Sequence, residues 1–247
     1  MVGRAVPVLM YHKIDHAPPR GGRALCVRPG AFRHQMAALR ATGYRGVSMR
    51  EAMPYLRGER SGRIAVLTFD DGYADTFERA LPVLRRHGHS ATCYMVSGRI
   101  GGHNAWDAGT PGARAPLMTE AQLRQWCAAG MEVGCHTATH PFLSQLDEDG
   151  IRRELRESRE RLRAMTGQAV DQFCYPYGDY DERVVAAVRE AGFVAATTTE
   201  RGRARPGGDL MRVPRIAIQH QHLLHAFLLK VLSPYGDRNR RTSSRSH

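Results

Sequence analysis

The sequence predicts a single α/β domain, a distorted TIM-like (β/α) barrel of seven or eight parallel strands surrounded by helices. Three observations support this fold class. Apolar strand-like runs alternate with helix-like runs at least six times. The strand-like runs lack alternating polarity, which is typical of strands buried on both faces of a parallel sheet. The length of 247 residues suits one barrel domain, and no repeat or linker divides the chain.

The expected strands, in chain order, are short apolar runs that end at polar or turn-forming residues. The first runs from Val6 to His12, and the second carries the run Ile-Ala-Val-Leu-Thr-Phe. The later strands are shorter, and each precedes a loop or a helix-like run. These strands cover 6–12, 63–69, 90–96, 131–135, 170–175, 193–198 and 215–218.

The expected helices, in the same order, have apolar residues at helical spacing between recognisable start and stop signals. Gly43 and Gly88 end the first two, and Thr119 with Gln122 forms a capping-box pattern at the start of the third. The fourth is long and charged, and the last is strongly apolar. These helices cover 32–42, 75–87, 119–129, 147–165, 181–191 and 220–232.

The composition narrows the function classes. The chain has 36 Lys+Arg against 24 Asp+Glu and a formal net charge of +12, yet no basic stretch is interleaved with stacking aromatic residues, so no nucleic-acid partner is expected. Five cysteines without a close pair predict reduced thiols. The apolar run at the start of the chain has no small-residue cleavage site, and no run is long enough to span a bilayer. We therefore expect a cytoplasmic protein.

Chemically reactive residues follow two of the expected strands. Asp70 and Asp71 come directly after 63–69, and adjacent carboxylates repel unless they share a cation or a proton. His136 and His140 come directly after 131–135, and their spacing of four places both imidazoles on one side of a turn, as metal ligation needs. Each pair has a simpler interpretation, an Asx turn or helix cap for the carboxylates and unrelated loop residues for the histidines.

Taken together, the two pairs predict hydrolytic chemistry. One carboxylate and two imidazoles make a three-ligand metal site with open positions for water and a substrate oxygen. The other carboxylate is then free to act as a general base on that water. Metal polarisation of a carbonyl beside a positioned base is what amide or ester hydrolysis requires.

These residues resemble the polysaccharide deacetylases of carbohydrate esterase family 4. The family's motif T-F-D-D-G matches 68–72 in full, and its motif H-[S/T]-x-x-H matches 136–140. The resemblance implies Asp70 as the base and Asp71, His136 and His140 as ligands of a divalent metal, zinc first, with cobalt or nickel as alternatives. It extends from about residue 8 to residue 218.

The third family motif departs from its usual form, R-x-P-Y. This chain has Cys174, Tyr175, Pro176 and Tyr177 there, so the backbone N–H of Tyr177 remains a candidate oxyanion donor. Cys174 stands where the family's arginine braces the base. Either another group holds Asp70, or the pKa of Asp70 is tuned differently. The simpler interpretation of both tyrosines is packing at a strand end.

Two histidines are candidates for the general acid. The run Leu-Met-Tyr-His that ends at His12 resembles the poly-N-acetylglucosamine deacetylase branch, in which an early histidine takes the acid's place. His220 fits the family's L-x-H pattern loosely, since it follows Ile218 and Gln219. We expect His12, at a strand end, to be the acid and keep His220 as the alternative. A core histidine is the simpler interpretation of both.

The insertion 98–116 and the last helix supply the remaining expectations. Trp106 with Asp107 and Asn104 is a common combination for holding a sugar ring, and Tyr175 is a further substrate contact; Trp106 as a packing anchor is the alternative. The helix 220–232 either closes the barrel or lies on an anionic membrane surface with the arginines that follow it.

We therefore expect residues 1–236 to form a metal-dependent N-deacetylase domain and 237–247 a basic tail. Asp70 deprotonates a metal-held water that attacks the acetamide, the metal and the Tyr177 N–H stabilise the oxyanion, and His12 or His220 protonates the amine. In the cytoplasm the substrate would be a lipopolysaccharide or other surface-glycan precursor, or a small glycoside. The alternatives are a non-catalytic carbohydrate-binding member and a peripheral-membrane partner in glycan assembly.

Overall fold

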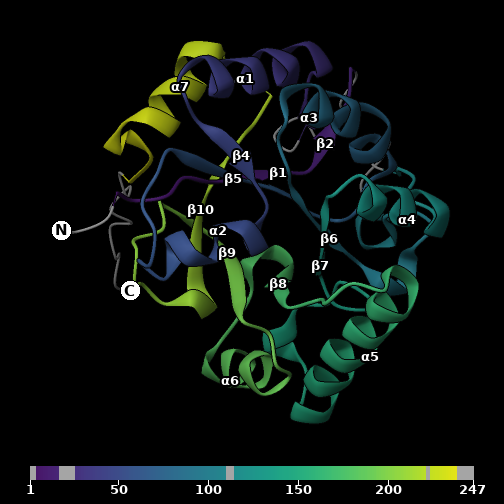
Figure 1. Ribbon diagram of the computed structural model, residues 1–247. Helices are drawn as coiled ribbons and strands as arrows, with labels where there is room; N and C mark the ends of the chain where they lie inside the picture. Colours follow the sequence, from purple (N-terminus) through teal and green to yellow (C-terminus); the bar gives the residue numbers. More distant parts are fainter. Residues whose placement is uncertain (1–3, 17–25, 110–113, 221–222, 238–247) are drawn as a thin grey trace, which may run out of the picture.

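The structure is a computed structural model that describes residues 4–16, 26–109, 114–220 and 223–237. Its centre is a closed barrel of seven parallel strands (Figure 1), as the sequence predicts. The barrel closes because β1 pairs with β5 on one side and with β10 on the other. In order around the barrel, the strands are β1 (Val8–Tyr11), β5 (Ile64–Phe69), β6 (Thr92–Met95), β7 (Glu132–Cys135), β8 (Gln172–Cys174), β9 (Ala195–Arg201) and β10 (Val213–Ala217).

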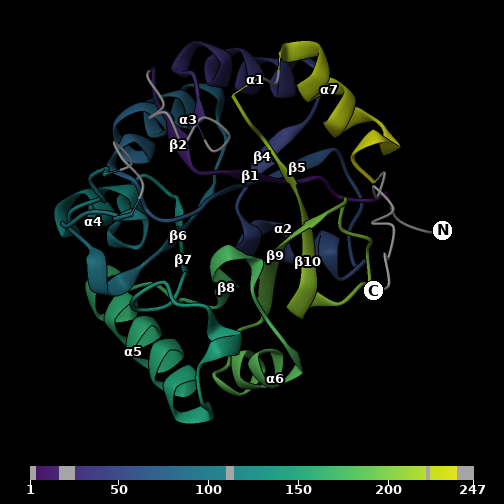
Figure 2. The same ribbon diagram turned by 180° about the vertical axis from the view of Figure 1, so that it is seen from behind.

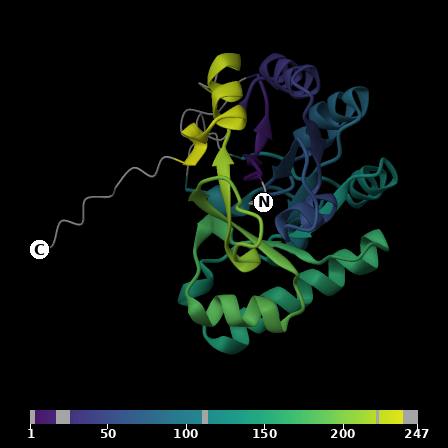
Figure 3. The same cartoon turned by 60° about the vertical axis from the view of Figure 1, so that its left-hand side comes forward.

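Helices surround the strands when the barrel is seen from either end (Figures 1 and 2). The outer helices are α1 (Pro29–Ala41), α3 (Leu81–His87), α4 (Glu120–Ala128), α5 (Glu148–Thr166), α6 (Glu182–Glu190) and α7 (Leu224–Leu232). A side view places α7 beside α1 on one flank (Figure 3), and the two helices are in contact.

The alternation of side chains along each strand creates two cores. In β1, Leu9 and Tyr11 point outward into the main core, and the ring of Tyr11 packs edge-on against Phe32 of α1 at 5.4 Å. Val8 points inward and belongs to a second, smaller core with Val66 of β5. The side chains that point inward thus fill the interior of the barrel, and those that point outward pack against the helices.

The short strand β4 (Arg45–Val47) and the helix α2 (Met49–Leu56) close the end of the barrel at which the strands begin. The backbone N–H of Met49 donates to the Thr92 hydroxyl at 2.8 Å, and that of Arg50 donates to the Glu132 carboxylate at 2.9 Å. Thr92 and Glu132 are the first residues of β6 and β7, so the N-terminus of α2 lies against the amino ends of the strands. The barrel is thus accessible from its carboxyl end, where parallel β/α barrels carry their active sites.

Several expected boundaries differ from the structure. The strand β4, the helix α2, which carries Pro54, and the strand pair β2 (Lys13–Ile14) and β3 (Cys26–Val27) were not expected, because each is too short to show a periodic pattern. The expected helix 75–87 consists of a π-helical turn, Thr76–Ala80, followed by α3. The last helix begins at Leu224, so its expected start at 220 was wrong; residues 221–222 lie outside the described part.

The end of the described chain is tied to the barrel. Asp237, the first residue of the expected tail, forms an ion pair with Arg203 at 2.7 Å. Residues 238–247 lie outside the described residues. None of the described helices has the length and apolar character to cross a membrane.

Candidate active site

Residues that follow five of the strands line one cavity of about 290 Å³ at the carboxyl end of the barrel. His12 follows β1, Asp70 and Asp71 follow β5, and the two motif histidines follow β7. The segment after β8 adds two tyrosines, and the insertion after β6 adds Trp106 and Asp107. The lining residues are Met10, His12, Asp70, Asp71, Trp106, Asp107, His136, His140, Tyr175, Tyr177 and Thr199.

Asp71, His136 and His140 form a compact group of potential metal ligands. Their donor atoms lie within 4.8 Å of one another, and all three residues are buried. The Asp71 Oδ1 is 3.4 Å from Nε2 of His136 and 3.5 Å from Nε2 of His140. Burial alone would raise the pKa of Asp71, but hydrogen bonds from the two imidazoles hold that pKa well below its usual range. The carboxylate therefore stays ionised.

The orientation of His136 fits metal binding. Its Nδ1 lies 2.7 Å from the backbone carbonyl oxygen of Cys174, which accepts a hydrogen bond and leaves Nε2 directed at Asp71. Anchoring one ring nitrogen to a carbonyl is the usual way in which a metal-ligating histidine is oriented. One carboxylate and two imidazole nitrogens with open positions also match the donor set of hydrolytic zinc sites. The residues present thus fit a divalent metal.

Asp70 lies beside this group and is held by Arg215 of β10. The two side chains form a bidentate pair, with Nη1 to Oδ1 at 2.7 Å and Nη2 to Oδ2 at 2.8 Å. Burial alone would raise the pKa of Asp70, but the Arg215 guanidinium lowers it below the usual value. Asp70 is therefore an ionised, fixed carboxylate, which is the state that a general base requires.

Every N–H of the Arg215 guanidinium has a partner inside the barrel. Besides the two bonds to Asp70, Nε donates to the backbone oxygen of Thr198 at 2.8 Å and Nη1 to the hydroxyl of Thr68 at 3.1 Å. Nη2 also lies 3.2 Å from the Cys174 sulfur. Arg215 thus occupies the role that the sequence left open when Cys174 was found in place of the motif arginine.

Arg215 was not among the expected site residues, although its place in the sequence carries a signal. Arg215 is a charged residue in the middle of the short strand β10, Val-Pro-Arg-Ile-Ala, and it is almost completely buried. A lone arginine at an inward position of a barrel strand needs a buried carboxylate as partner. Asp70 and Asp71 were the available candidates.

Backbone strain is concentrated at this site. Among the described residues, four that are not glycine have positive φ: Asp71 (73°), Thr137 (65°), His140 (67°) and Tyr177 (58°). Such residues cost free energy and persist where the surrounding structure holds them. Asp71 and Tyr177 are each followed by a glycine that also has positive φ. A Cβ atom on Gly178 would come within 2.0 Å of the Thr199 hydroxyl, so this sharp turn requires glycine.

The two candidate acids occupy different places. His12 lines the cavity, and its Nε2 lies 3.8 Å from Oδ2 of Asp70. His220 is not among the lining residues, and its buried Nδ1 has no hydrogen-bond partner within the described part of the chain. The geometry thus favours His12 as the expected acid over His220.

The expected substrate contacts divide into two groups. Trp106 stacks on His140 with ring centroids 4.5 Å apart, and Asp107 and Tyr175 also line the cavity. The Tyr175 hydroxyl donates to the backbone oxygen of Met211 at 3.0 Å, so only its ring faces the cavity. Asn104 does not reach the cavity. Its amide N–H donates to Asp107 at 2.7 Å and its oxygen accepts from the Ala115 N–H at 2.6 Å, so it braces the insertion.

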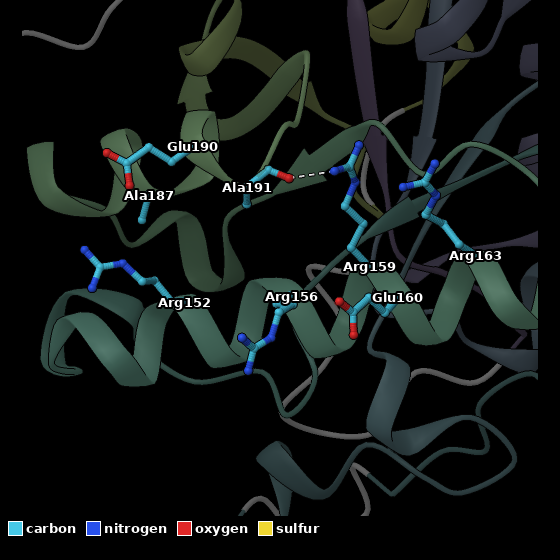
Figure 4. A pocket seen from close by; sticks show the side chains of 8 residues that line it. All are labelled: Arg152, Arg156, Arg159, Glu160, Arg163, Ala187, Glu190 and Ala191. Carbon is cyan, nitrogen blue, oxygen red and sulfur yellow. Dashed lines mark hydrogen bonds between the residues drawn. The ribbon is translucent and has the colours of Figure 1, made fainter.

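A larger cavity, of about 430 Å³, lies between α5 and α6 and has different chemistry (Figure 4). Arginines of α5 line it, and Arg159 is engaged with the backbone oxygen of Ala191 at 2.6 Å. Among the described residues, the groups that could hold a metal ion all lie at the barrel end. We therefore assign the chemistry to the smaller cavity.

Comparison with known proteins agrees with the site. The family model described as "Polysaccharide deacetylase" matches residues 57–196. A relative from Bacillus subtilis (strain 168), named "Putative polysaccharide deacetylase YxkH", is 28% identical over 215 residues. The match covers 86% of this chain and 71% of that protein. The poly-beta-1,6-N-acetyl-D-glucosamine N-deacetylase of Staphylococcus aureus (strain MRSA252) is 22% identical over 209 residues, 81% of this chain and 70% of that one. The structure of Streptococcus pyogenes deacetylase PplD in complex with acetate superposes with a TM-score of 0.82 at 25% identity, covering 94% of this chain and 100% of that one.

Proposed function

Because this chain belongs to the polysaccharide deacetylase family, we propose that it hydrolyses the N-acetyl group of an N-acetylated sugar. The products are acetate and a free amino sugar. The observation that carries this proposal is the buried juxtaposition of an ionised base, Asp70, with the ligand group of Asp71, His136 and His140.

The metal, when bound by Asp71, His136 and His140, would polarise the acetamide carbonyl and make water more acidic. Asp70 accepts the proton of the attacking water, because Arg215 keeps its carboxylate ionised and its oxygens fixed. The backbone N–H of Tyr177, in the strained turn after β8, donates to the oxygen that becomes negative. His12 donates a proton to the sugar nitrogen as the carbon–nitrogen bond breaks.

The walls of the cavity suit a sugar. Trp106 stacks on the His140 ring and Tyr177 packs edge-on against it, at 4.5 and 4.4 Å between centroids, so the ligand group is bordered by aromatic surface. Asp107 adds a carboxylate within the same cavity. This carboxylate would favour a leaving amine that becomes cationic.

We also propose a cytoplasmic substrate, such as a lipid-linked surface-glycan or lipopolysaccharide precursor or a small glycoside. The support is that all five cysteines are free thiols, which persist in reducing compartments. Subcellular fractionation tests the location, and recovery of the protein outside the cytoplasm and inner membrane would refute it.

The direct test of function is acetate release from defined sugars. The purified chain, loaded with zinc, cobalt or nickel, is incubated with N-acetylglucosamine, chitooligosaccharides, β-1,6-linked N-acetylglucosamine oligomers and lipid-linked precursors. Release by the wild type, reduced about 100-fold or more in Asp70→Asn, supports the proposal, since a general base contributes about 10² to 10⁴ in rate. Saturable sugar binding without acetate release would instead favour a non-catalytic carbohydrate-binding protein.

A further inference from the structure

Exposed apolar side chains gather at the end of the described chain. Eight large apolar residues are exposed among the described residues, and five of them lie between residues 223 and 235. These five are Leu223 (66% exposed), Leu224 (42%), Leu229 (45%), Leu232 (37%) and Tyr235 (41%), and we call them the α7 face. Large apolar side chains that stay exposed together in one short segment are typical of interaction sites.

The helix α7 is apolar on two sides. Phe227 and Val231, one turn apart, are fully buried and fix the inner side of the helix against the barrel domain. Leu229 and Leu232 lie on another side of the helix and stay 45% and 37% exposed, whereas Leu224, in the first turn, is on the same side as Phe227. Ordinary surface helices present polar residues on the side away from the core. The side of α7 that carries Leu229 and Leu232 therefore has the composition of a surface that a partner covers.

Positive charge borders the α7 face. The guanidinium of Arg201 lies 5.5 Å from the ring centroid of Tyr235 and donates to the Tyr235 backbone oxygen at 2.9 Å. Lys230, on the helix itself, donates to the backbone oxygen of Ala217 at 3.1 Å. The sequence from 216 to 247 holds one carboxylate, Asp237, which pairs with Arg203. Within the described residues of the same stretch, Lys230 is the cationic side chain.

This charge distribution selects the partner. Two copies of the face brought together would set cation against cation, which disfavours self-association. A lipid surface with anionic headgroups offers opposite charge to the border and an apolar layer to the leucines. We propose that the α7 face docks on an anionic membrane surface, with α7 lying in the plane of the interface and the described cations Arg201 and Lys230 at headgroup level. This inference is independent of the proposed reaction.

Vesicle co-sedimentation of the full chain tests the proposal. The vesicles are phosphatidylcholine alone or phosphatidylcholine with phosphatidylglycerol. The wild type is expected to bind the phosphatidylglycerol vesicles, and binding should weaken as salt rises. The double variant Leu229→Ser/Leu232→Ser should bind at least about tenfold more weakly, because the buried apolar area is lost.

A matched control separates the α7 face from general surface apolarity. Val194, in the connection between α6 and β9, has the same exposed fraction as Leu232, 37%. Val194→Ser should bind vesicles as the wild type does, and all variants should keep the wild-type melting temperature. Equal binding to both vesicle types, or equal loss in Val194→Ser, would overturn the proposal. A concentration-dependent dimer in light scattering that Leu229→Ser/Leu232→Ser dissolves would overturn it in favour of a second copy.

Discussion

Replacing Arg215 with methionine tests the physical account of the base. Methionine fills a similar volume without charge, so the change removes both hydrogen bonds to Asp70, at 2.7 and 2.8 Å, and leaves its carboxylate buried. Breaking a buried ion pair by removing one partner costs about 3–5 kcal/mol of folding free energy. Much of that cost is relieved if Asp70 takes up a proton, because burial raises its pKa and the change removes the Arg215 guanidinium, the strongest of the groups that lower it.

The expected kinetic result follows from the same change. Protonated Asp70 cannot accept a proton from water, so we expect kcat/KM at neutral pH to fall about 100-fold or more. The acidic limb of the pH–rate profile should move to higher pH in Arg215→Met. Arg215→Lys keeps a positive charge but cannot form the bidentate contact with Asp70. The acidic limb of its pH–rate profile should therefore stay closer to that of the wild type, while kcat still falls.

The assay is acetate release from an N-acetylated sugar between pH 5 and 9, with the melting temperature measured in parallel. A purely structural role for Arg215 would lower the melting temperature and leave the pH profile of the remaining folded enzyme unchanged. An unmoved acidic limb together with a kcat/KM within a few-fold of wild type would refute the assignment of Arg215 as the residue that positions and ionises the base.

Three further predictions concern residues around the site. Burial raises the pKa of Asp75 to about 6 from an ordinary 3.8, so the native state binds more protons than the unfolded state between these values and loses stability as pH rises through them. Asp75→Asn should therefore raise the free energy of unfolding at pH 8 by up to about 3 kcal/mol and change it little near pH 4, as calorimetry at both pH values would reveal. Cys174→Arg should lose several kcal/mol, about 3–5, because Nη2 of Arg215 already lies 3.2 Å from the Cys174 sulfur and a second buried cation would lack a partner, whereas thermal melts should find Cys174→Ser near wild type. Asn104→Ala should raise KM more than it lowers kcat in steady-state assays, since Asn104 holds Asp107 in place rather than contacting substrate; an unchanged KM would contradict this.

The sequence predicted the barrel and the reactive pairs because their signals are local. Apolar runs identify strands, and Asp70, Asp71, His136 and His140 directly follow two of them. Since parallel strands end at one edge of the barrel, the pairs had to meet there. The short elements β4 and α2 carried no sustained period, so the closure of the amino end of the barrel was not expected.

Arg215 and Asn104 show what the sequence alone did not decide. The bond from Arg215 to Asp70 joins residues 145 positions apart, and it depends on which strand neighbours which in the closed barrel. Asn104 has the residue type of a sugar ligand, but its side chain is used by the insertion itself, through Ala115 and Asp107. The residue type of Asn104 suggested contact with a sugar, and only its hydrogen-bond partners in the structure show that it supports the insertion instead.

The central claim, that Asp71, His136 and His140 hold a catalytic metal beside Asp70, is tested most directly by metal content measured with acetate release. The account predicts about one equivalent of divalent metal per chain in the wild type, and loss of both metal and acetate release in His136→Ala. Asp70→Asn should keep the metal and lose the activity, which separates the base from the ligands. Acetate release that persists in His136→Ala after the metal is lost, or a wild type that binds no divalent metal even after reconstitution, would contradict the account.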